Sequence, residues 1–543
     1  MLDIEKNFFG RQDVLSLLKK RVIDLKDGYR QNLAFLGPQF IGKTSILQKF
    51  ICDLDDKDLV TVYVNFERKD LHYLFTNFVG SILYHFSKNQ GLEPHQDINL
   101  LIEATKSRLP QTVSAIKHVQ ALLEKRRMAE AYQGLISLLE TFSIESNKFC
   151  LVVFDEFHHL EDFDIPDAFQ ELGKRIMTQK RCLYVMASSF QHLARKILSE
   201  KLSLLFGHFE VLEIEPLMLK TSQEFITHSL KDIQIKDPLK NFLVDFTGGH
   251  PFYLNILIGE LVQLCQIHRQ TEIFLPLLSQ AIENTIFNRW GVLSRHFEIL
   301  TDHLTSSKDS HETFRLLIAL ADPKNKIEDV VVSNGLKKMV VKQKIAKLLE
   351  ADLLDRNGHS YYLKDKLFRY WIKYILRQRL SFIGLDLKEE RELFRKELAS
   401  AMSDFYVVSQ KDLSLRVIEL LSCFQDEIFS LHGRRYRLSP FQKFKSSKLR
   451  VSPERQLDTI KAYTSEGSWV IVLNEKDLSE NEMSVFVNEV KKTGQKSQKQ
   501  IIISLANLEN PVRLRALQEK MWIWSERELN FLFNMYDKPY IVK

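Results

Sequence analysis

The sequence is poor in cysteine, glycine and proline, and it has no long apolar run. Its 543 residues include five Cys, 19 Gly and 13 Pro. The cysteines lie far apart without a C-x-x-C pair, which excludes a disulfide framework and a cysteine zinc site and favours a reducing, cytoplasmic location. No stretch approaches the roughly 20 apolar residues that cross a bilayer, and the first residues lack the apolar core of a signal peptide. We therefore expect a globular, cytoplasmic chain with no membrane partner.

The sequence also lacks a dominant charge of one sign. The net charge is +6, and residues 381–543 carry 26 Lys and Arg against 23 Asp and Glu, so that this part and the remainder each hold +3. Neither part is polybasic, and nucleic-acid binding would therefore have to come from local patches. The length is enough for roughly three or four domains.

One glycine-containing turn is the most informative feature that is present. It lies between the apolar run 33–36 and a helical pattern, and it comprises Gly37, Pro38, Gln39, Phe40, Ile41, Gly42, Lys43, Thr44 and Ser45. The spacing G-x-x-x-x-G-K-T in a strand–loop–helix setting is the Walker A pattern, whose backbone N–H groups face phosphates. Lys43 would reach the β- and γ-phosphates of a nucleotide, and the Thr44 hydroxyl would ligate Mg²⁺. The alternative is a turn without a ligand.

A second acidic motif follows about a hundred residues later. Residues 151–154 are consecutive apolar residues, as in a strand buried on both faces, and Asp155 and Glu156 follow them directly. This is a Walker B pattern, in which Asp155 would hold Mg²⁺ through water and Glu156 would act as general base. The alternative is a strand end capped by solvated acids. The two motifs together predict a site for ATP and Mg²⁺.

The alternation of strands and helices predicts an α/β fold with a parallel sheet in the first part of the chain. Strands are expected at 33–36, 59–66, 151–156, 182–187 and 209–214, and ligands bind at the carboxyl ends of such strands. We predict a P-loop ATPase core over 1–216, a helical lid over 217–303, a winged helix over 304–380 and a mixed α/β domain over 381–543. In the winged helix, a third helix is expected from Lys337 to about Leu354, followed by a hairpin with its tip at 356–358.

The order of these motifs resembles the archaeal-type ATPases of the STAND class of P-loop NTPases, relatives of AAA+ proteins. The shared features over residues 5–378 are F-x-G-R near the start, both Walker motifs, a Ser-Ser strand end, a G-G-H-P turn and a winged helix. The resemblance implies that Pro251 lies against the adenine and that Phe9, Gly10 and Arg11 pass its other side. It also implies that Ser188 or Ser189 reads the γ-phosphate, and we name Ser188 as catalytic beside Glu156 and Lys43. Gly207-His208 replaces the family's Gly-Arg, and no sensor-2 arginine can be assigned, which suggests slow turnover.

Two basic segments are candidates for contact with DNA. The third helix of the winged helix carries Lys337, Lys338, Lys342, Lys344 and Lys347, and residues 431–450 carry Arg434, Arg435 and Arg437 together with interleaved aromatic residues. Such patterns suit a nucleic-acid surface. Solvated helix and strand faces would give the same patterns.

The end of the chain resembles PD-(D/E)XK nucleases. Asp458 and the strand that ends in Leu473-Asn474-Glu475-Lys476 correspond to the D…E-x-K pattern, but the E-x-K spacing is lost. Glu475 could serve only after a register slip, which would turn every side chain of the strand to the other face. We therefore expect a nuclease-like fold without nuclease activity.

Three functions remain open at this point. The first is an ATP-binding and ATP-hydrolysing switch that acts through a protein partner or self-association. The second is a DNA-directed ATPase in mobile-element or defence work. The third, an ATP-gated nuclease, is the least favoured because the E-x-K spacing is lost.

Overall fold

The computed structural model describes residues 8–541 except 68–69, 94, 203–206, 306–309, 323–324, 336, 359, 382–386, 432–433, 493–497 and 507. The chain divides into two compact units, Met1–Pro216 with Glu350–Asp352 and Leu217–Leu349 with Leu353–Lys543. Among the described helices, none combines the length and the apolar composition that crossing a membrane requires.

The first unit is built on a five-stranded sheet in the order β2-β3-β4-β1-β5, and every pairing in it is parallel. The strands are β1 (Asn32–Leu36), β2 (Leu59–Asn65), β3 (Phe149–Asp155), β4 (Cys182–Ser188) and β5 (Phe209–Glu213). Every residue of β1 and β4 is buried, as expected for strands covered on both faces. The predicted parallel α/β core is confirmed, and all of its strands point their carboxyl ends to one edge.

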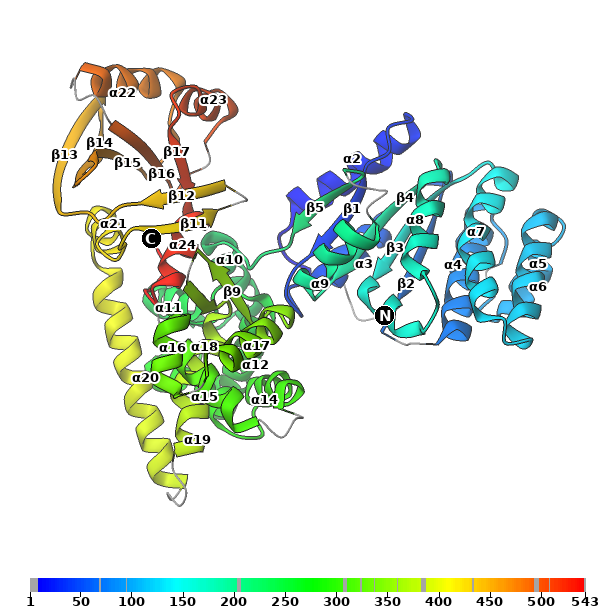
Figure 1. The fold of residues 1–543 in the computed structure, drawn as a ribbon, viewed down its shortest axis with the longest axis horizontal. Helices are drawn as coiled ribbons and strands as arrows, with labels where there is room; N and C mark the ends of the chain where they lie inside the picture. The colour runs from blue at the N-terminus through cyan, green and yellow to red at the C-terminus, as the bar shows by residue number, and fades with distance from the viewer. Residues whose placement is uncertain are drawn as a thin grey trace. The chain divides into compact units, whose positions relative to one another are not determined.

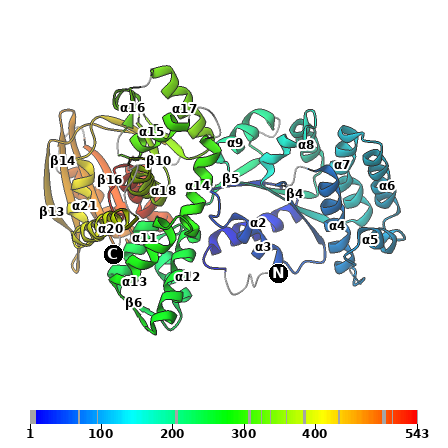
Figure 2. The ribbon, with the colours of Figure 1, turned by 90° about the horizontal axis from the view of Figure 1, so that it is seen from below.

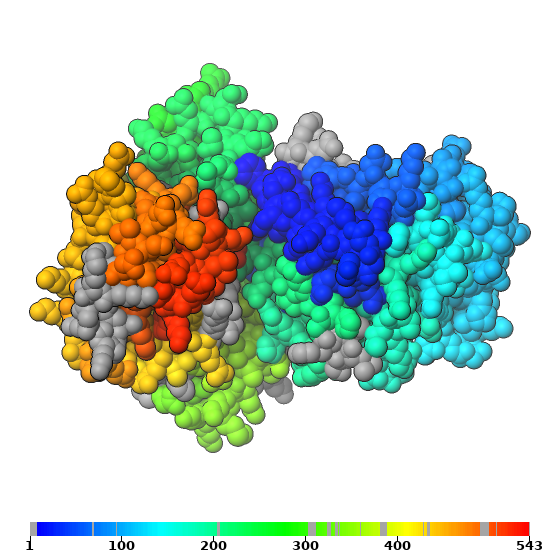
Figure 3. Space-filling view, turned by 90° about the horizontal axis from the view of Figure 1, so that it is seen from above, coloured from blue at the N-terminus to red at the C-terminus, as the bar shows by residue number. Residues whose placement is uncertain are grey.

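Helices cover both faces of this sheet (Figures 1 and 2). On one face, α2 (Gln12–Lys26) and α3 (Lys43–Cys52) pack on alternate strand residues such as Phe35 and Val153. On the other face lie α8 (Ala168–Thr178) and α9 (Gln191–Lys196), which pack with Val152 and Met186. The outer side of α2 is exposed, and the N-terminal part of this unit lies on the surface in blue in Figure 3.

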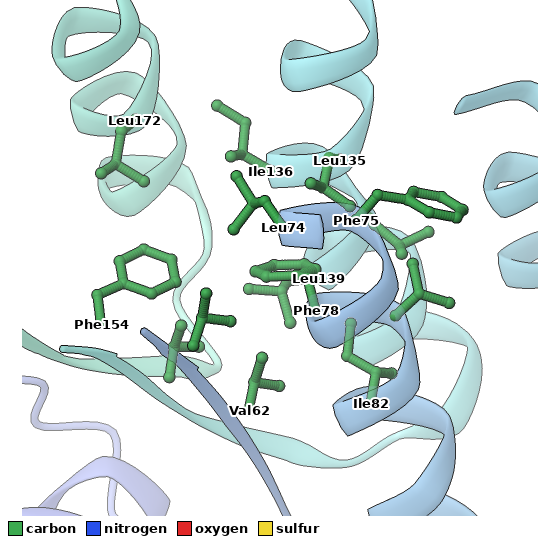
Figure 4. Packing of buried hydrophobic residues seen from close by; sticks show 14 of the residues in the cluster. Val62, Leu74, Phe75, Phe78, Ile82, Leu135, Ile136, Leu139, Phe154 and Leu172 are labelled. Carbon is green, nitrogen blue, oxygen red and sulfur yellow. The ribbon is translucent and has the colours of Figure 1, made fainter. Parts of the chain in front are cut away.

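Four helices occupy the connection from β2 to β3, where a single crossover helix would suffice. They are α4 (Leu71–Asn89), α5 (Ile98–Thr105), α6 (Pro110–Glu124) and α7 (Met128–Ser146). Figure 4 shows that Leu74, Phe78 and Ile82 of α4 meet Leu135 and Leu139 of α7 above the sheet. This apolar cluster anchors the helical insertion to the strand that precedes Asp155, since Phe154 belongs to the same cluster.

The second unit begins with helices. They are α10 (Leu219–Leu230), α11 (Asp237–Thr247), α12 (Pro251–His268), α13 (Leu275–Ile282) and α14 (Val292–Thr305), with a two-residue parallel pairing of β6 (Gln234–Ile235) and β7 (Glu272–Ile273). The turn between α11 and α12 is tight, because a Cβ atom on Gly249 would lie 2.3 Å from the Leu217 carbonyl oxygen. Only glycine fits there.

Three helices and a small sheet follow in this unit. The helices are α15 (Ser310–Ala321), α16 (Ile327–Asn334) and α17 (Lys338–Glu350), and the sheet has the order β8-β10-β9 with β8 (Asn325–Lys326), β9 (Leu354–Asn357) and β10 (Ser360–Leu363). The predicted hairpin is present, but α17 ends at Glu350 rather than near Leu354. Asp352 has φ 56°, a left-handed conformation that does not continue a helix.

The C-terminal part contains the mixed sheet that the sequence predicts. After α18 (Lys366–Trp371), α19 (Arg377–Ser381), α20 (Leu387–Ser409) and α21 (Leu413–Leu421), an antiparallel pair is formed by β11 (Glu427–Leu431) and β12 (Arg434–Leu438). The main sheet has the order β13-β14-β15-β16-β17, antiparallel up to β15 and parallel after it. Its elements are β13 (Lys443–Ser452), β14 (Arg455–Thr464), β15 (Gly467–Asn474), α22 (Glu480–Lys492), β16 (Gln498–Ser504), α23 (Asn510–Gln518), β17 (Trp522–Ser525) and α24 (Glu526–Met535).

Candidate nucleotide site

The turn between β1 and α3 has the backbone of a phosphate-binding loop. Gly42 caps α3 with φ 103°, a conformation that only glycine adopts without strain. A Cβ atom on Gly37 would lie 2.5 Å from the carbonyl oxygen of Ile214, so a side chain is excluded there as well. The ten-residue helix α3 therefore starts with unpaired N–H groups and the positive end of its dipole at the loop, as an anion requires.

Lys43 lies inside this loop and is 4% exposed. Its ammonium group donates hydrogen bonds to the carbonyl oxygens of Gly37 (3.0 Å) and Pro38 (2.9 Å) and to Ser189 Oγ (2.8 Å). Burial lowers the pKa of Lys43, and the nearby carboxylates of Glu156 and Asp155 oppose that shift. The cation is held where the loop would enclose phosphates.

Asp155 is fully buried and accepts three hydrogen bonds. The hydroxyls of Thr44 (2.7 Å) and Tyr63 (2.8 Å) both donate to Oδ2, and the Glu156 amide donates to Oδ1 (3.1 Å). Burial, with Asp155 beside it, raises the pKa of the Tyr63 hydroxyl far above its ordinary value, so this hydroxyl keeps its proton and acts as a donor. Tyr63 could not be singled out from the sequence, because its only signal is its place two residues before the end of a neighbouring strand.

Glu156 follows Asp155 with a left-handed backbone, φ 50°. Ser189 binds its carboxylate twice, through the backbone N–H to Oε2 (2.8 Å) and through the hydroxyl to Oε1. Burial raises the pKa of Glu156, and Lys43 and the Ser189 donors partly offset this. The carboxylate lies 4.0 Å from the Lys43 ammonium group, so the acid, the cation and the serine form one connected cluster.

The two serines at the end of β4 face different surroundings. Ser188, the residue named as catalytic from the sequence, is fully buried, and its hydroxyl contacts His158 Nδ1 at 2.9 Å. Ser189 is the serine that touches Lys43 and Glu156. Neighbouring side chains along a strand point apart, and Ser189, which directly follows β4, is the one of the two that lies beside Lys43 and Glu156. The catalytic role of Ser188 remains a prediction.

The residues expected to flank the adenine lie in two different units. Gly10 and Arg11 have left-handed backbones just before α2, and the Arg11 guanidinium donates to the Glu215 carbonyl oxygen. Phe9 is half-buried in the first unit. Pro251 is the first residue of α12 in the second unit and is half-buried. Their contact with adenine remains a prediction.

The lysines at the start of the helix α17 and along it are exposed except Lys344, and Lys338 and Lys344 form ion pairs. Lys338 forms an ion pair with Glu328 (2.9 Å), and Lys344 forms one with Glu312 (3.4 Å). Lys337, Lys342 and Lys347 are exposed. On β12, Arg437 makes two bonds to Asp426 (2.8 and 2.9 Å), Arg435 is exposed, and the side chain of Arg434 lies outside the described residues. Surface pairs of this kind contribute little to stability.

The tip of the β9–β10 hairpin packs against β11. A Cβ atom on Gly358 would lie 2.1 Å from the Ile428 carbonyl oxygen, and Asn357 is 6% exposed, with its amide 3.3 Å from Met535 Sδ. Tyr362 belongs to the apolar cluster of the C-terminal sheet and meets Phe531 edge-on. The hairpin is therefore covered by protein at Asn357 and Gly358, while Arg356 is exposed.

In the C-terminal sheet, the residues of the nuclease-like pattern do not converge. The Asp458 side chain is 52% exposed and lies 4.0 Å from Lys448. Asn474 ends β15 and is buried, where it accepts a bond from Arg455 (2.8 Å) and donates to Ser504 Oγ (2.8 Å). Glu475 follows the strand and is exposed. The register slip that would bring Glu475 into place is absent.

The donor set at the end of β3 fits a nucleoside triphosphate with Mg²⁺. A hydroxyl on a carboxylate, a buried ammonium group and a helix N-terminus are the groups that P-loop sites use, with phosphate and water completing the metal's six ligands. Among the described residues, no cluster of three or more His, Cys, Asp or Glu offers a metal cage. Such a cage is not needed by Mg²⁺, which keeps several waters.

No protein-family model matches this chain, and no curated protein matches it by sequence. Solved structures with a similar fold include the Walker-type ATPase PABY2304 of Pyrococcus abyssi, which is 14% identical, with 68% of this chain and 96% of that chain covered and a TM-score of 0.47. The ORC2 protein of Aeropyrum pernix is 11% identical (70% and 98% covered, TM-score 0.43), and the RuvB branch migration motor of Thermotoga maritima is 13% identical (67% and 96% covered, TM-score 0.33). These likenesses are too distant to assign a function.

Proposed function

We propose that this protein is an ATP-hydrolysing switch whose nucleotide state is passed to a protein partner or to a second copy. The observation that carries the proposal is the cluster of Lys43, Ser189 and Glu156 next to the pair formed by Thr44 and Asp155. Lys43 and Thr44 begin α3, Asp155 ends β3, and Glu156 and Ser189 directly follow β3 and β4.

Each residue has a distinct task in this proposal. The N–H groups of residues 37–44 and the Lys43 ammonium group bind the phosphates, while Thr44 and Asp155 hold the metal. Mg²⁺, when bound, neutralises charge on the transferring phosphate. Glu156 takes a proton from the attacking water, and Ser189 holds that carboxylate in position. Of Ser188 and Ser189, the two residues that the resemblance offered as readers of the γ-phosphate, this proposal gives the active role to Ser189.

Binding of ATP to the full chain tests this proposal directly. A fluorescent ATP analogue with Mg²⁺ should bind the wild type, and Lys43→Ala should weaken binding at least tenfold, since a hydrogen bond to a charged group is worth about 1.5–3 kcal/mol. Lys49→Ala is the matched control, because Lys49 lies on the same helix and pairs with Asp53 (2.8 Å). Equal affinities for the two variants would refute the assignment of the loop.

We also propose the domain roles that follow from the resemblance to STAND-class and AAA+ ATPases. Residues 217–303 would act as a lid, 304–380 as a winged helix and 381–543 as an inactive nuclease-like domain. The helix–helix–helix–hairpin order of 310–363 supports the second role, and the exposed Asp458 supports the loss of nuclease activity. Hydrolysis would then change how the lid and the winged helix engage a partner.

The covered hairpin tip favours a protein partner over DNA. A winged helix that binds DNA would use its third helix and its hairpin. Here the third helix does expose lysines, and Arg356 is exposed, but Gly358 and Asn357 of the hairpin tip pack on β11 and α24. The winged helix in this proposal is a brace between the lid and the C-terminal sheet.

A DNA-directed ATPase is the second candidate, and β13 is the observation in its favour. This edge strand exposes Lys443, Lys445, Lys448 and Arg450, and residues 443–450 contain no acid. Duplex DNA should then stimulate ATP turnover severalfold, in a salt-sensitive way, and Lys445→Gln should reduce the effect while Lys19→Gln on α2 should not. If DNA does not change the rate of ATP turnover, these cations would instead serve to prevent the edge strand from pairing with another chain.

A further inference from the structure

We propose that Tyr63 sets the metal preference of the nucleotide site by keeping Asp155 out of direct contact with the metal. This inference rests on the proposed function, since it concerns the same ATP site. It assigns a specificity-determining role to a tyrosine of β2 that belongs to neither Walker motif.

The position of Tyr63 follows from the strand register. Asn65 is paired with Asp155 across the parallel strands β2 and β3, and Tyr63 lies two residues earlier. Residues two apart on a strand share a face, and Tyr63 packs on the face that α3 covers. Its long side chain therefore reaches along that face to the carboxylate at the strand end. The backbone N–H of Tyr63 is held by Ser81 Oγ (3.2 Å).

The hydrogen bonds to Asp155 occupy Oδ2, the carboxylate oxygen that the Thr44 hydroxyl contacts. A carboxylate oxygen has two lone pairs. Those of Oδ2 are taken by the hydroxyls of Thr44 and Tyr63, at 2.7 and 2.8 Å. Thr44 can ligate the metal through its own oxygen and still donate its proton to Oδ2. The other carboxylate oxygen, Oδ1, faces the Glu156 amide.

This saturation has a consequence for the choice of metal. An ion that keeps its water shell can bind beside a carboxylate that it does not touch. Mg²⁺ loses its waters reluctantly, whereas Ca²⁺ takes six to eight oxygen ligands, carboxylates among them, in a flexible geometry. An Oδ2 with both lone pairs taken therefore suits Mg²⁺. Without the Tyr63 hydroxyl, Oδ2 would have a lone pair for direct ligation, and the site would accept Ca²⁺ more readily.

The alternative is that Tyr63 merely satisfies a buried carboxylate. Its removal would then weaken the fold or the nucleotide site as a whole, with no difference between metals. A comparison of the two metals separates these roles, because a loss of folding or of loop structure would reduce binding with both.

The experiment measures binding of a fluorescent, non-hydrolysable ATP analogue to the full chain during titration with Mg²⁺ or with Ca²⁺. The wild type should require less Mg²⁺ than Ca²⁺. Tyr63→Phe keeps the ring and removes the hydroxyl. The ratio of the Ca²⁺ to the Mg²⁺ concentration needed for half-maximal binding should then fall about tenfold, which is the lower end of the effect on metal affinity when an outer-shell hydrogen bond is lost. Tyr84→Phe, on the exposed side of α4, should leave the preference unchanged.

Two results would overturn the inference while leaving the proposed function intact. One is that the wild type binds the analogue equally well with Ca²⁺ and with Mg²⁺, a result that can be obtained without any variant. The other is a folded Tyr63→Phe protein with the wild-type metal preference. A wild type that binds no nucleotide with either metal would instead refute the proposed function.

Discussion

In each of the two large sheets, a central strand ends in polar residues, but the partners of these residues differ. At the end of β3, Asp155 meets the hydroxyls of Thr44 and Tyr63, and Glu156 meets Ser189 and Lys43. At the end of β15, Asn474 is bound by the Arg455 guanidinium, which also contacts Glu482 (3.0 Å) and the carbonyl oxygens of Lys476 and Asp477.

The difference lies in what fills the space beside the strand end. In the first sheet, the strand end adjoins a glycine-containing loop and a helix N-terminus, and the cation there is held by two neutral carbonyl oxygens and a serine hydroxyl. In the C-terminal sheet, the donors of one arginine are used by protein acceptors. The first strand end therefore gathers a cation, two acids and a helix N-terminus, whereas the second pairs one arginine with protein oxygens.

The largest expected effect concerns the general base. Glu156→Gln should lower ATP turnover at least a hundredfold, because general base catalysis contributes about 10²–10⁴, while binding of the ATP analogue is retained. Release of phosphate and analogue fluorescence measure the two quantities. Glu130→Gln is the control, because Glu130 is an exposed residue of α7. If Glu156→Gln keeps the wild-type turnover, the contrast between the two sheets is wrong.

The second effect concerns stability of the C-terminal sheet. Arg455→Met should lower the free energy of unfolding of the second unit by about 2 kcal/mol, since it removes the hydrogen bonds of a charged guanidinium group, and should leave ATP binding unchanged. All five Trp residues lie beyond residue 289, so urea unfolding followed by tryptophan fluorescence reports on this unit. Loss of ATP binding in Arg455→Met would show that the two sheets are not independent.

A smaller effect is expected in the pH dependence of turnover. Burial raises the pKa of Glu156 above its ordinary value of 4.5, so the carboxyl group keeps its proton to higher pH than an exposed glutamate. Only the ionised form is a base, and turnover should therefore fall about tenfold per pH unit below the raised pKa. The acid limb should begin above pH 4.5 in the wild type and be absent from the residual activity of Glu156→Gln. A wild-type limb at or below the ordinary value would contradict the burial argument.

The smallest effect is expected at Asp458. Because this carboxylate is half exposed and its nearest cation is 4.0 Å away, Asp458→Ala should change the unfolding free energy by less than about 0.5 kcal/mol and should not alter any reaction with DNA. A DNA cleavage activity that disappears in Asp458→Ala would revive the nuclease interpretation.

Much of the fold could be predicted because its signals are local. The Walker loop, the buried strand before Asp155 and the hairpin at 354–363 are each encoded within a few neighbouring residues. The parallel core and the mixed C-terminal sheet followed from the spacing of such segments, and both are confirmed.

The missed features depend on contacts between residues distant in sequence. Tyr63 reaches Asp155 across 92 positions, and its role depends on β2 lying next to β3. The choice between Ser188 and Ser189 depends on which face of β4 meets Lys43. The end of α17 depends on the left-handed backbone of Asp352. Aspartate adopts other backbone conformations as well, and the sequence therefore does not reveal where this helix ends.

The covered hairpin also has a practical consequence for engineering this chain. Asn357-Gly358 looks in the sequence like a loop tip, the usual place to insert a tag or a fluorescent protein. Because the backbone of Gly358 lies against β11, any inserted segment would have to push β11 away from β9. Such an insertion would separate the C-terminal sheet from the helices before it, and so the hairpin is a poor position for a label but a direct means of uncoupling these two parts of the chain.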